Sequence, residues 1–557
     1  MDRDFFNVWR NRYIRSRLNK CFFDDLQLKV TLNYCKRNEK DLHDLLVGTN
    51  AFVHLDVVDS ESKLSDYLGH PCASIINKID LKFDSLDIPP DIVLPPTIKM
   101  LGLYDTVVSY TLLPQSLTAL VVHNTEFRPL DDSYGTVALP SGLKHLEDFI
   151  STIDKKVILE CRSLESFTYT YVMDEEKGMG SKFLPPNLKE IDLGILAGPI
   201  GEDVLPQSLT KIYGSLDIKR LKSVAFSSSE KRVEADIKIF DYDEDLALIK
   251  PWMVQLTIHD EIHSIPEGCS IVPDHITVLS LARFNIPLQI RMLPNCLVKL
   301  EMQQFNQDLV PGLLPESLRY LWLSNYKRYL QPNVLPSKLI QLEIHDLKCL
   351  DIHPPQSILP DSLKILEFYY CRDTAGCLSG MIPSSVTRLL VVTHDPLFLD
   401  TGVIPPSVVD LELLYLSHFE KVVIPPSVVN LKLKAEEQPQ LLIPTSVQTL
   451  SLGFIPTPGF IPGTVKKVYF KTSTTSALKP GVVPLGCQYV YFQNLCTSLS
   501  NVLPASITTL VIKKHTNVPE HFLYELTTPI KNLRLYTTFA KVPQHIFQNV
   551  IINDHFQ

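Results

Sequence analysis

The stretch from Arg291 to Leu323 reads RMLPNCLVKLEMQQFNQDLVPGLLPESLRYLWL and contains nearly the same unit twice. MLPNCLVKLEM, which begins at Met292, is followed 21 residues later by LLPESLRYLWL. Each copy has a Leu-Pro pair, two further residues, and then apolar residues spaced three and two apart. Such self-similarity is typical of repeat proteins, in which one unit cannot bury its apolar side chains alone. The sequence therefore predicts a stack of similar coils.

The unit recurs along most of the chain. In two wide gaps Phe167 and Ile237 take the place of the leucine, and the leucine register extends to Leu55 and Ile79 at one end and to Leu533 at the other. This gives 23 register positions with a mean spacing of about 22 residues, close to that of short leucine-rich repeats. The aligned prolines are Pro95, Pro114, Pro140, Pro185, Pro206, Pro273, Pro294, Pro315, Pro336, Pro360, Pro383, Pro405, Pro425, Pro444, Pro462, Pro484 and Pro504.

The letters of one coil predict its shape. Proline restricts the residue before it to extended backbone, so we expect Pro315 at the second position of a turn in which Ser317 bonds the backbone. Side chains of a strand alternate between its two faces. The expected inward residues of this coil are Leu318, Leu321 and Leu323. The prediction is a leucine-rich-repeat-like solenoid, with one short parallel β-strand per coil forming a long concave sheet, proline-containing turns and a helical N-terminal cap.

Two segments carry a more specific pattern. RFNIPL contains Phe284 to Leu288, and QFNQDL, with Phe305 to Leu309, is a degraded copy of it. With the proline-leucine half, which covers about residues 94 to 535, the chain resembles the FNIP-repeat proteins, relatives of the leucine-rich-repeat family. This resemblance implies a non-enzymatic repeat scaffold, and some relatives carry an F-box in front of their repeats.

The N-terminal segment differs from the repeats. From Phe5 to Phe23 apolar residues recur at near-helical spacing. The same segment carries four arginines and one lysine between Arg10 and Lys20, with no acidic residue among them. A helix lying on a membrane surface has the same pattern. We favour a cap, because the first coil of a solenoid needs its apolar end covered. The expected domains are therefore a helical cap segment at 1–48 and a solenoid at 49–557, whose last residues form a C-terminal cap.

Composition excludes several classes of function. The formal charge is −9, and no lysine or arginine tract is present to follow a phosphate backbone, so we expect no nucleic-acid partner. No run of 18 apolar residues predicts a membrane span. The 11 cysteines contain no Cys-x-x-Cys, which favours a reducing, cytoplasmic location. The acidic run Asp241 to Asp245 lacks the glycine and glutamate of a calcium loop. The sequence also contains no Gly-x-Ser-x-Gly, no glycine-rich phosphate loop and no His-Glu-x-x-His, so no metal, cofactor or catalytic residue is predicted.

Outward strand residues form the expected binding face. A first candidate set combines aromatic and acidic residues, and a second consists of tyrosines; both compositions occur at partner sites, but aromatic residues are also common on solvated sheets. The candidate protein-binding residues are Tyr320, Trp322, Glu343, Glu367, Tyr369, Tyr469, Tyr489 and Tyr491, and Gln341 and His345 lie next to the first set.

The predicted function is a non-enzymatic intracellular scaffold that binds another protein through the concave face of the sheet. The alternative is a substrate-recognition subunit of a ubiquitin-ligase complex, whose ligase components would dock on the N-terminal segment. Neither hypothesis identifies the partner.

Overall fold

The computed structural model divides the chain into two compact units. Unit 1 contains residues 1–239 and 243–256, and unit 2 contains residues 240–242 and 257–557. The structure describes residues 27–30, 32–37, 39–46, 52–58, 61–128, 138–169, 184–193, 200–201, 204–226, 228, 231–345, 358–369, 381–392, 402–414, 422–473, 478–499, 501–514, 530, 532–535 and 549–552.

Unit 1 is a stack of coils whose strands pair in parallel and in chain order, β1 with β2 and so on to β10. The strands are β1 (Gln27–Lys29), β2 (Phe52–Val58), β3 (Lys78–Asp87), β4 (Met100–Val108), β5 (Ala119–Phe127), β6 (His145–Ser151), β7 (Ser166–Tyr169), β8 (Glu190–Asp192), β9 (Lys211–Asp217) and β10 (Val233–Ile239). Short helices occur between them: α3 (Leu32–Arg37), α4 (Glu39–Leu46), α5 (Glu61–Leu68), η1 (Pro71–Ile75), η2 (Tyr110–Leu112), α6 (Lys155–Glu160) and η3 (Ile218–Leu221).

The boundary between the units falls in the segment that follows β10. This segment contains α7 (Tyr242–Asp245), η4 (Leu246–Leu248) and β11 (Met253–Ile258).

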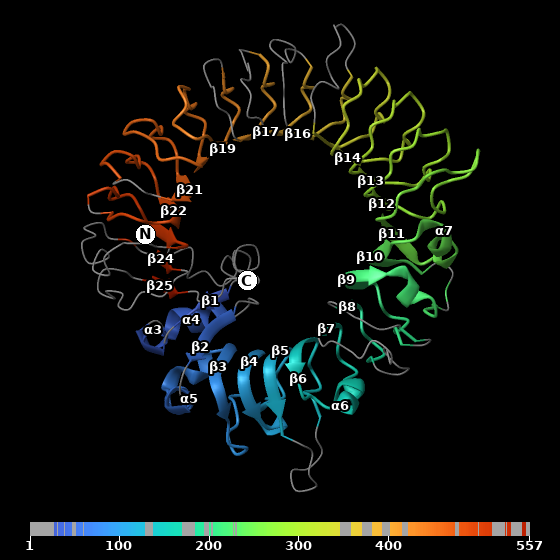
Figure 1. Ribbon diagram of the computed structural model, residues 1–557. Coiled ribbons are helices and arrows are strands. Elements are labelled where there is room, and N and C mark those ends of the chain that lie inside the picture. The colour runs from blue at the N-terminus through green and yellow to red at the C-terminus, as the bar shows by residue number, and fades with distance from the viewer. Residues whose placement is uncertain are drawn as a thin grey trace. The chain divides into compact units, whose positions relative to one another are not determined.

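Unit 2 repeats the same arrangement with shorter strands. Each strand from β12 to β25 pairs in parallel with the next. Within this unit the strands follow the inner edge of the curved stack, with the turns on the outer edge (Figure 1). The strands are β12 (Val278–Leu281), β13 (Lys299–Met302), β14 (Tyr320–Leu323), β15 (Gln341–Ile344), β16 (Ile365–Tyr369), β17 (Arg388–Val392), β18 (Asp410–Leu414), β19 (Asn430–Lys434), β20 (Thr449–Leu452), β21 (Lys467–Ser473), β22 (Tyr489–Asn494), β23 (Thr509–Ile512), β24 (Asn532–Leu535) and β25 (Asn549–Ile552).

The structure confirms a parallel β-solenoid. Each expected register position, from Leu55 in β2 to Leu533 in β24, lies in a strand. In unit 2 the register leucines face one another directly, as Leu279, Leu300 and Leu321 do. One position was wrong: Ala235, not Ile237, pairs with Ile212, because the β9–β10 register shifts after Ala235.

The proline turn differs from the prediction. In every aligned coil the proline carbonyl accepts a hydrogen bond from the N–H three residues later, as Pro315 does from Leu318 at 3.0 Å. Proline therefore occupies the first position of the turn rather than the second. It lies outside the strand, so the ladder loses no donor to it.

In many of the described coils the motif serine bonds a backbone carbonyl of the preceding coil instead of its own turn. The Ser317 hydroxyl donates to the Leu297 carbonyl at 2.6 Å, one coil earlier. Ser116, Ser163, Ser208, Ser362, Ser407, Ser446 and Ser506 make the same kind of bond, at 2.6–2.8 Å. These bonds satisfy buried carbonyls between coils, which explains why the motif contains a small hydroxyl residue.

The core of unit 2 lies behind the strands. Leu318, Leu321 and Leu323 are buried as predicted. On the turn that follows the strand, the rings of Phe284, Phe305 and Tyr326 stack across three coils, with centroids 5.9 and 6.2 Å apart. The Phe of the Phe-Asn pattern is thus a core residue that links neighbouring coils.

The predicted helix at Phe5 to Phe23 lies outside the described residues. The remainder of the expected cap segment contains β1, which pairs with β2, and the helices α3 and α4. The division at residue 48 stays a prediction. Among the helices that the structure describes, none is long and apolar enough to cross a membrane.

Candidate functional site

Strand register brings the first candidate set together on the exposed face of unit 2. In β14, Tyr320 lies beside Gln341 and Trp322 beside Glu343 of β15. Glu343 in turn lies beside Glu367 of β16. We call Tyr320, Trp322, Glu343, Glu367 and Tyr369 the tryptophan patch. The patch extends over three coils, and its first and last residues, Tyr320 and Tyr369, are 49 positions apart in sequence. It forms one surface because each coil adds one strand to the sheet.

A shallow hollow of about 300 Å³ lies in the tryptophan patch. Its lining is made by β13, β14 and β15: Lys299, Leu300, Glu301, Tyr320, Leu321, Trp322, Gln341 and Glu343. The Trp322 indole Nε1 is a buried donor without a hydrogen-bond partner. A buried N–H that bonds nothing costs about 1–3 kcal/mol, so the packing of this ring carries a cost in the folded chain.

The charges of the tryptophan patch repel one another. Burial, followed by the charge of Glu367, raises the pKa of the Glu343 carboxyl above its ordinary value, and a hydrogen bond with Tyr369 only partly opposes this. Burial and the two glutamates raise the pKa of Tyr369 to about 12. The His345 ring packs 4.7 Å from the Tyr369 ring, and burial lowers the pKa of this histidine. The patch is therefore acidic, and its acidity costs the folded state free energy.

The second candidate set is also assembled by register. Tyr469 lies beside Tyr491, and its ring centroid is 5.2 Å from that of Tyr489 and 5.8 Å from that of Tyr491. The Lys471 ammonium lies 4.2 Å from the Tyr491 ring centroid and 5.7 Å from that of Tyr469. Burial, and then the charges of Lys513 and Lys432, lowers the pKa of Lys471. We call Tyr469, Tyr489 and Tyr491 the tyrosine patch; its neighbouring charge is positive.

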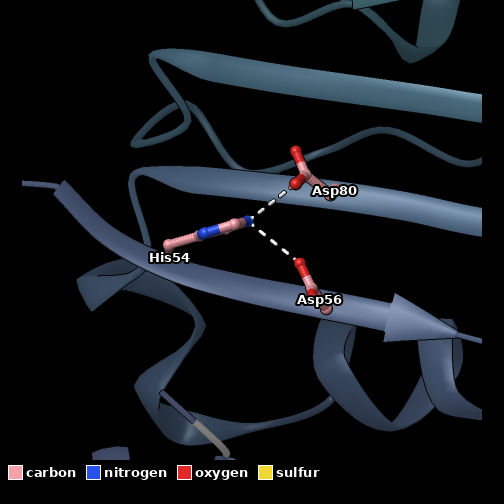
Figure 2. Close-up of side chains that lie close together, drawn as sticks. All are labelled: His54, Asp56 and Asp80. Atoms are coloured by element: carbon pink, nitrogen blue, oxygen red, sulfur yellow. Dashed lines mark hydrogen bonds and ion pairs between the residues drawn. The ribbon is translucent and has the colours of Figure 1, made fainter. Parts of the chain in front are cut away.

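Unit 1 contains a cluster that sequence reasoning missed. Figure 2 shows the His54 ring pointing between the carboxylates of Asp56 and Asp80, on the adjacent strands β2 and β3. His54 Nε2 is 3.0 Å from Asp56 Oδ1 and 2.9 Å from Asp80 Oδ2. The Lys82 ammonium is 3.6 Å from Asp56 Oδ2 and 3.8 Å from Asp80 Oδ2.

The environment of this cluster favours the charged carboxylate. Burial raises the pKa of Asp80, but its hydrogen bond with His54 and the charges of His54, Lys78 and Lys82 lower it by more, so the net pKa is below its ordinary value. A signal was present in the sequence: VHLDV and KIDLK are consecutive coils, and aligning them on Leu55 and Ile79 places Asp56 beside Asp80.

Comparison with protein families identifies the repeat. The FNIP Repeat model matches residues 305–347, which include β14 and β15. Residues 305–347 are similar to an FNIP repeat. The match begins at Phe305, the aromatic residue of the stack described above, and confirms the FNIP resemblance within those residues.

Solved structures similar to this chain are leucine-rich-repeat proteins. CroV588, described as a novel circular LRR protein, is 20% identical, with a TM-score of 0.40, and the match covers 88% of this chain and 77% of that one. For YopM from Yersinia enterocolitica WA-314 the identity is 16%, the coverages are 85% and 91%, and the TM-score is 0.29. YopM from Yersinia pestis, a leucine-rich effector protein, is 18% identical, with a TM-score of 0.29, and the match covers 66% of this chain and 85% of that one. A comparison with curated proteins found no match.

Proposed function

We propose that this chain is a non-enzymatic cytoplasmic scaffold that binds another protein through the exposed sheet face of unit 2. The observation that carries the proposal is the pair of aromatic side chains of β14, Tyr320 and Trp322, that line a solvent-facing hollow over adjacent strands of the sheet. Tryptophan and tyrosine are the residues most enriched among those that dominate binding energy at protein interfaces.

The glutamates of the tryptophan patch favour a partner with a basic side chain. Glu301, Glu343 and Glu367 occupy the same face of β13, β15 and β16, with Trp322 of β14 between the first two. Glu301 pairs with Lys299 at 2.7 Å, whereas Glu343 and Glu367 are adjacent in register. Burial and then the charge of Glu367 raise the pKa of Glu343, and the hydrogen bond with Tyr369 and the charge of Lys299 compensate its negative charge only in part. A lysine or arginine from a partner would supply that compensation, so the proposed partner presents a basic side chain next to the group that enters the hollow.

The tyrosine patch supports the same function with the opposite charge. Burial and then the charges of Lys513 and Lys432 lower the pKa of Lys471, which favours an acidic group on the partner next to Lys471. Five strand steps separate β16 from β21, or about 24 Å at about 4.8 Å per strand. A partner surface of ordinary interface size is long enough to contact both patches.

The ubiquitin-ligase alternative depends on docking by the N-terminal segment, residues 1–48, of which residues 1–26 lie outside the described residues. No contact in the described part of the chain favours it over a general scaffold, so the proposal stays with protein binding.

Proximity labelling in cells tests the proposal. The chain is compared with Tyr320→Ala plus Trp322→Ala, and with Tyr329→Ala as the matched control, because Tyr329 belongs to the same coil but is a 59% exposed turn residue. Circular dichroism establishes that all three chains fold alike. We expect at least one protein to be labelled by the wild type and the control and lost from the double variant. Identical lists from all three chains would contradict the proposal.

A further inference from the structure

The cluster on β2 and β3 of unit 1 has the donor set of a metal site. We propose that His54, Asp56 and Asp80 bind one divalent first-row transition-metal ion, with Zn²⁺ as the preferred occupant. One imidazole nitrogen with two carboxylate oxygens suits Zn²⁺ and its neighbours, whereas Mg²⁺ and Ca²⁺ favour all-oxygen sites. This inference is independent of the protein-binding proposal.

The distances fit such an ion. The three donor atoms all lie within 4.8 Å of one another, and His54 Nε2 is 2.9 and 3.0 Å from the two carboxylate oxygens. With metal–ligand bonds of about 2.0–2.2 Å, neighbouring donors of a tetrahedral zinc ion lie about 3.3 Å apart. Lengthening the two His54–carboxylate distances by a few tenths of an ångström therefore brings these pairs of donors to coordination geometry, and the fourth position is left for water.

The backbone holds these donors in place. Asp56 and Asp80 are direct register partners, so parallel pairing of β2 and β3 fixes their spacing. The Asn77 side chain accepts a hydrogen bond from the Val53 N–H at 2.7 Å, next to His54. His54 is 8% and Asp80 7% exposed, which limits the ways in which their side chains can turn to solvent. A site built on adjacent strands loses little conformational freedom when the ion binds.

Gly102 of β4 leaves the space that Asp80 needs. Gly102 is the register partner of Asp80, and a Cβ at this position would lie 2.4 Å from Asp80 Oδ1. A larger residue at 102 would therefore displace the Asp80 carboxylate from its present position. This gives a variant that disturbs the site without removing a ligand.

Lys82 explains how the cluster is stable without an ion. Its ammonium lies beyond ordinary hydrogen-bond distance of both carboxylates, at 3.6 and 3.8 Å, and partly balances their charge. A bound cation would take over this balance, and the Lys82 ammonium would keep its other contact, 5.3 Å from the Tyr104 ring centroid. The alternative is an ion-pair network of His54, Lys82 and the two carboxylates that binds no metal.

Calorimetric titration of the chelator-stripped full-length chain with Zn²⁺ distinguishes these alternatives. We expect one equivalent to bind the wild type, and His54→Gln and Asp80→Asn each to weaken its affinity by about 100-fold or more. His123→Gln is the matched control, since His123 is an exposed histidine on β5 of the same sheet, and its affinity should equal that of the wild type. The absence of any bound equivalent in the wild type, or equal affinity in all four chains, would overturn the proposal.

Two further measurements keep the test decisive. Co²⁺ bound to the wild type should show no sulfur-to-metal charge-transfer absorption, because the proposed ligands contain no sulfur, whereas an exposed thiol such as that of Cys269 or Cys296 would give such a band. A strong sulfur band would assign the bound ion to cysteine and overturn the proposal. If His54→Gln or Asp80→Asn does not fold by circular dichroism, Gly102→Ala and Asp56→Asn replace them, with the same expected loss.

Discussion

The serine between coils leads to a stability prediction with an internal control. Ser317→Ala removes the hydroxyl that donates to the Leu297 carbonyl at 2.6 Å. Leu297 is fully buried, so its carbonyl has little access to water as a replacement. Alanine fits the same space, and the change therefore isolates the hydrogen bond.

The expected change in the free energy of unfolding follows from the lost Ser317 hydroxyl and the Leu297 carbonyl that is left without its donor. A neutral intramolecular hydrogen bond contributes about 0.5–1.5 kcal/mol net, and a buried polar group left without its partner costs about 1–3 kcal/mol. Alanine recovers a little of this by being less polar than serine. We expect Ser317→Ala to lower the free energy of unfolding by about 1–2 kcal/mol, a change of about 5–30-fold in the folded-to-unfolded ratio.

Urea denaturation followed by tryptophan emission measures this change, since Trp322 lies in the same coil. Ser385→Ala and Ser427→Ala are the controls: both serines hold the motif position, but their hydroxyls are buried and bond nothing. These two variants should be within about 0.5 kcal/mol of the wild type or slightly more stable. An equal loss in all three variants, or no loss in Ser317→Ala, would refute the role assigned to the inter-coil bond.

Two other predictions concern the core and the tryptophan patch. Phe305→Ala should cost about 3–5 kcal/mol in urea denaturation, because a fully buried ring is removed from a three-ring stack, whereas the exposed Tyr329→Ala should change the free energy by less than about 0.5 kcal/mol; equal effects would contradict the stack. In the folded chain the pKa of Glu343 is raised, so its charged form destabilises the fold, and stability falls as the pH rises from 4.5 through the raised pKa. Glu343→Gln should therefore be more stable than the wild type at pH 7 and lose that advantage below about pH 4, while its partner binding weakens; lower stability at pH 7 would show that the carboxylate is compensated within the chain.

The strand positions could be predicted because each coil carries its own local signal. The spacing of Leu318, Leu321 and Leu323 specifies the inward face of a strand, and the neighbouring coils repeat it. The prediction failed at Ile237, where the Leu-Pro half of the motif is absent and a register shift moves the pairing by two residues. A two-residue shift keeps the same face inward, so hydrophobicity alone could not reveal it.

Contacts between coils were harder to infer. The partner of Ser317 is a carbonyl 20 residues earlier, and an isolated motif does not indicate which of the nearby backbone acceptors is reached. His54 and Asp80 were missed because a search for ligand motifs looks for short spacings, whereas these residues are 26 positions apart and become neighbours only through strand pairing. The tryptophan patch was proposed from outward alternation, but the unpartnered Nε1 of Trp322 depends on side-chain packing across three strands.

Site-specific photo-cross-linking tests the central claim, that the exposed sheet face around Trp322 binds a protein, most directly. The photoreactive residue p-benzoylphenylalanine replaces Tyr320 on the sheet face in one chain and Tyr329 on the turn in another, and both chains are irradiated in cells. We predict a covalent adduct with a distinct protein from position 320 and none from position 329. Adducts from position 329 alone, or the same adducts from both positions, would contradict the claim.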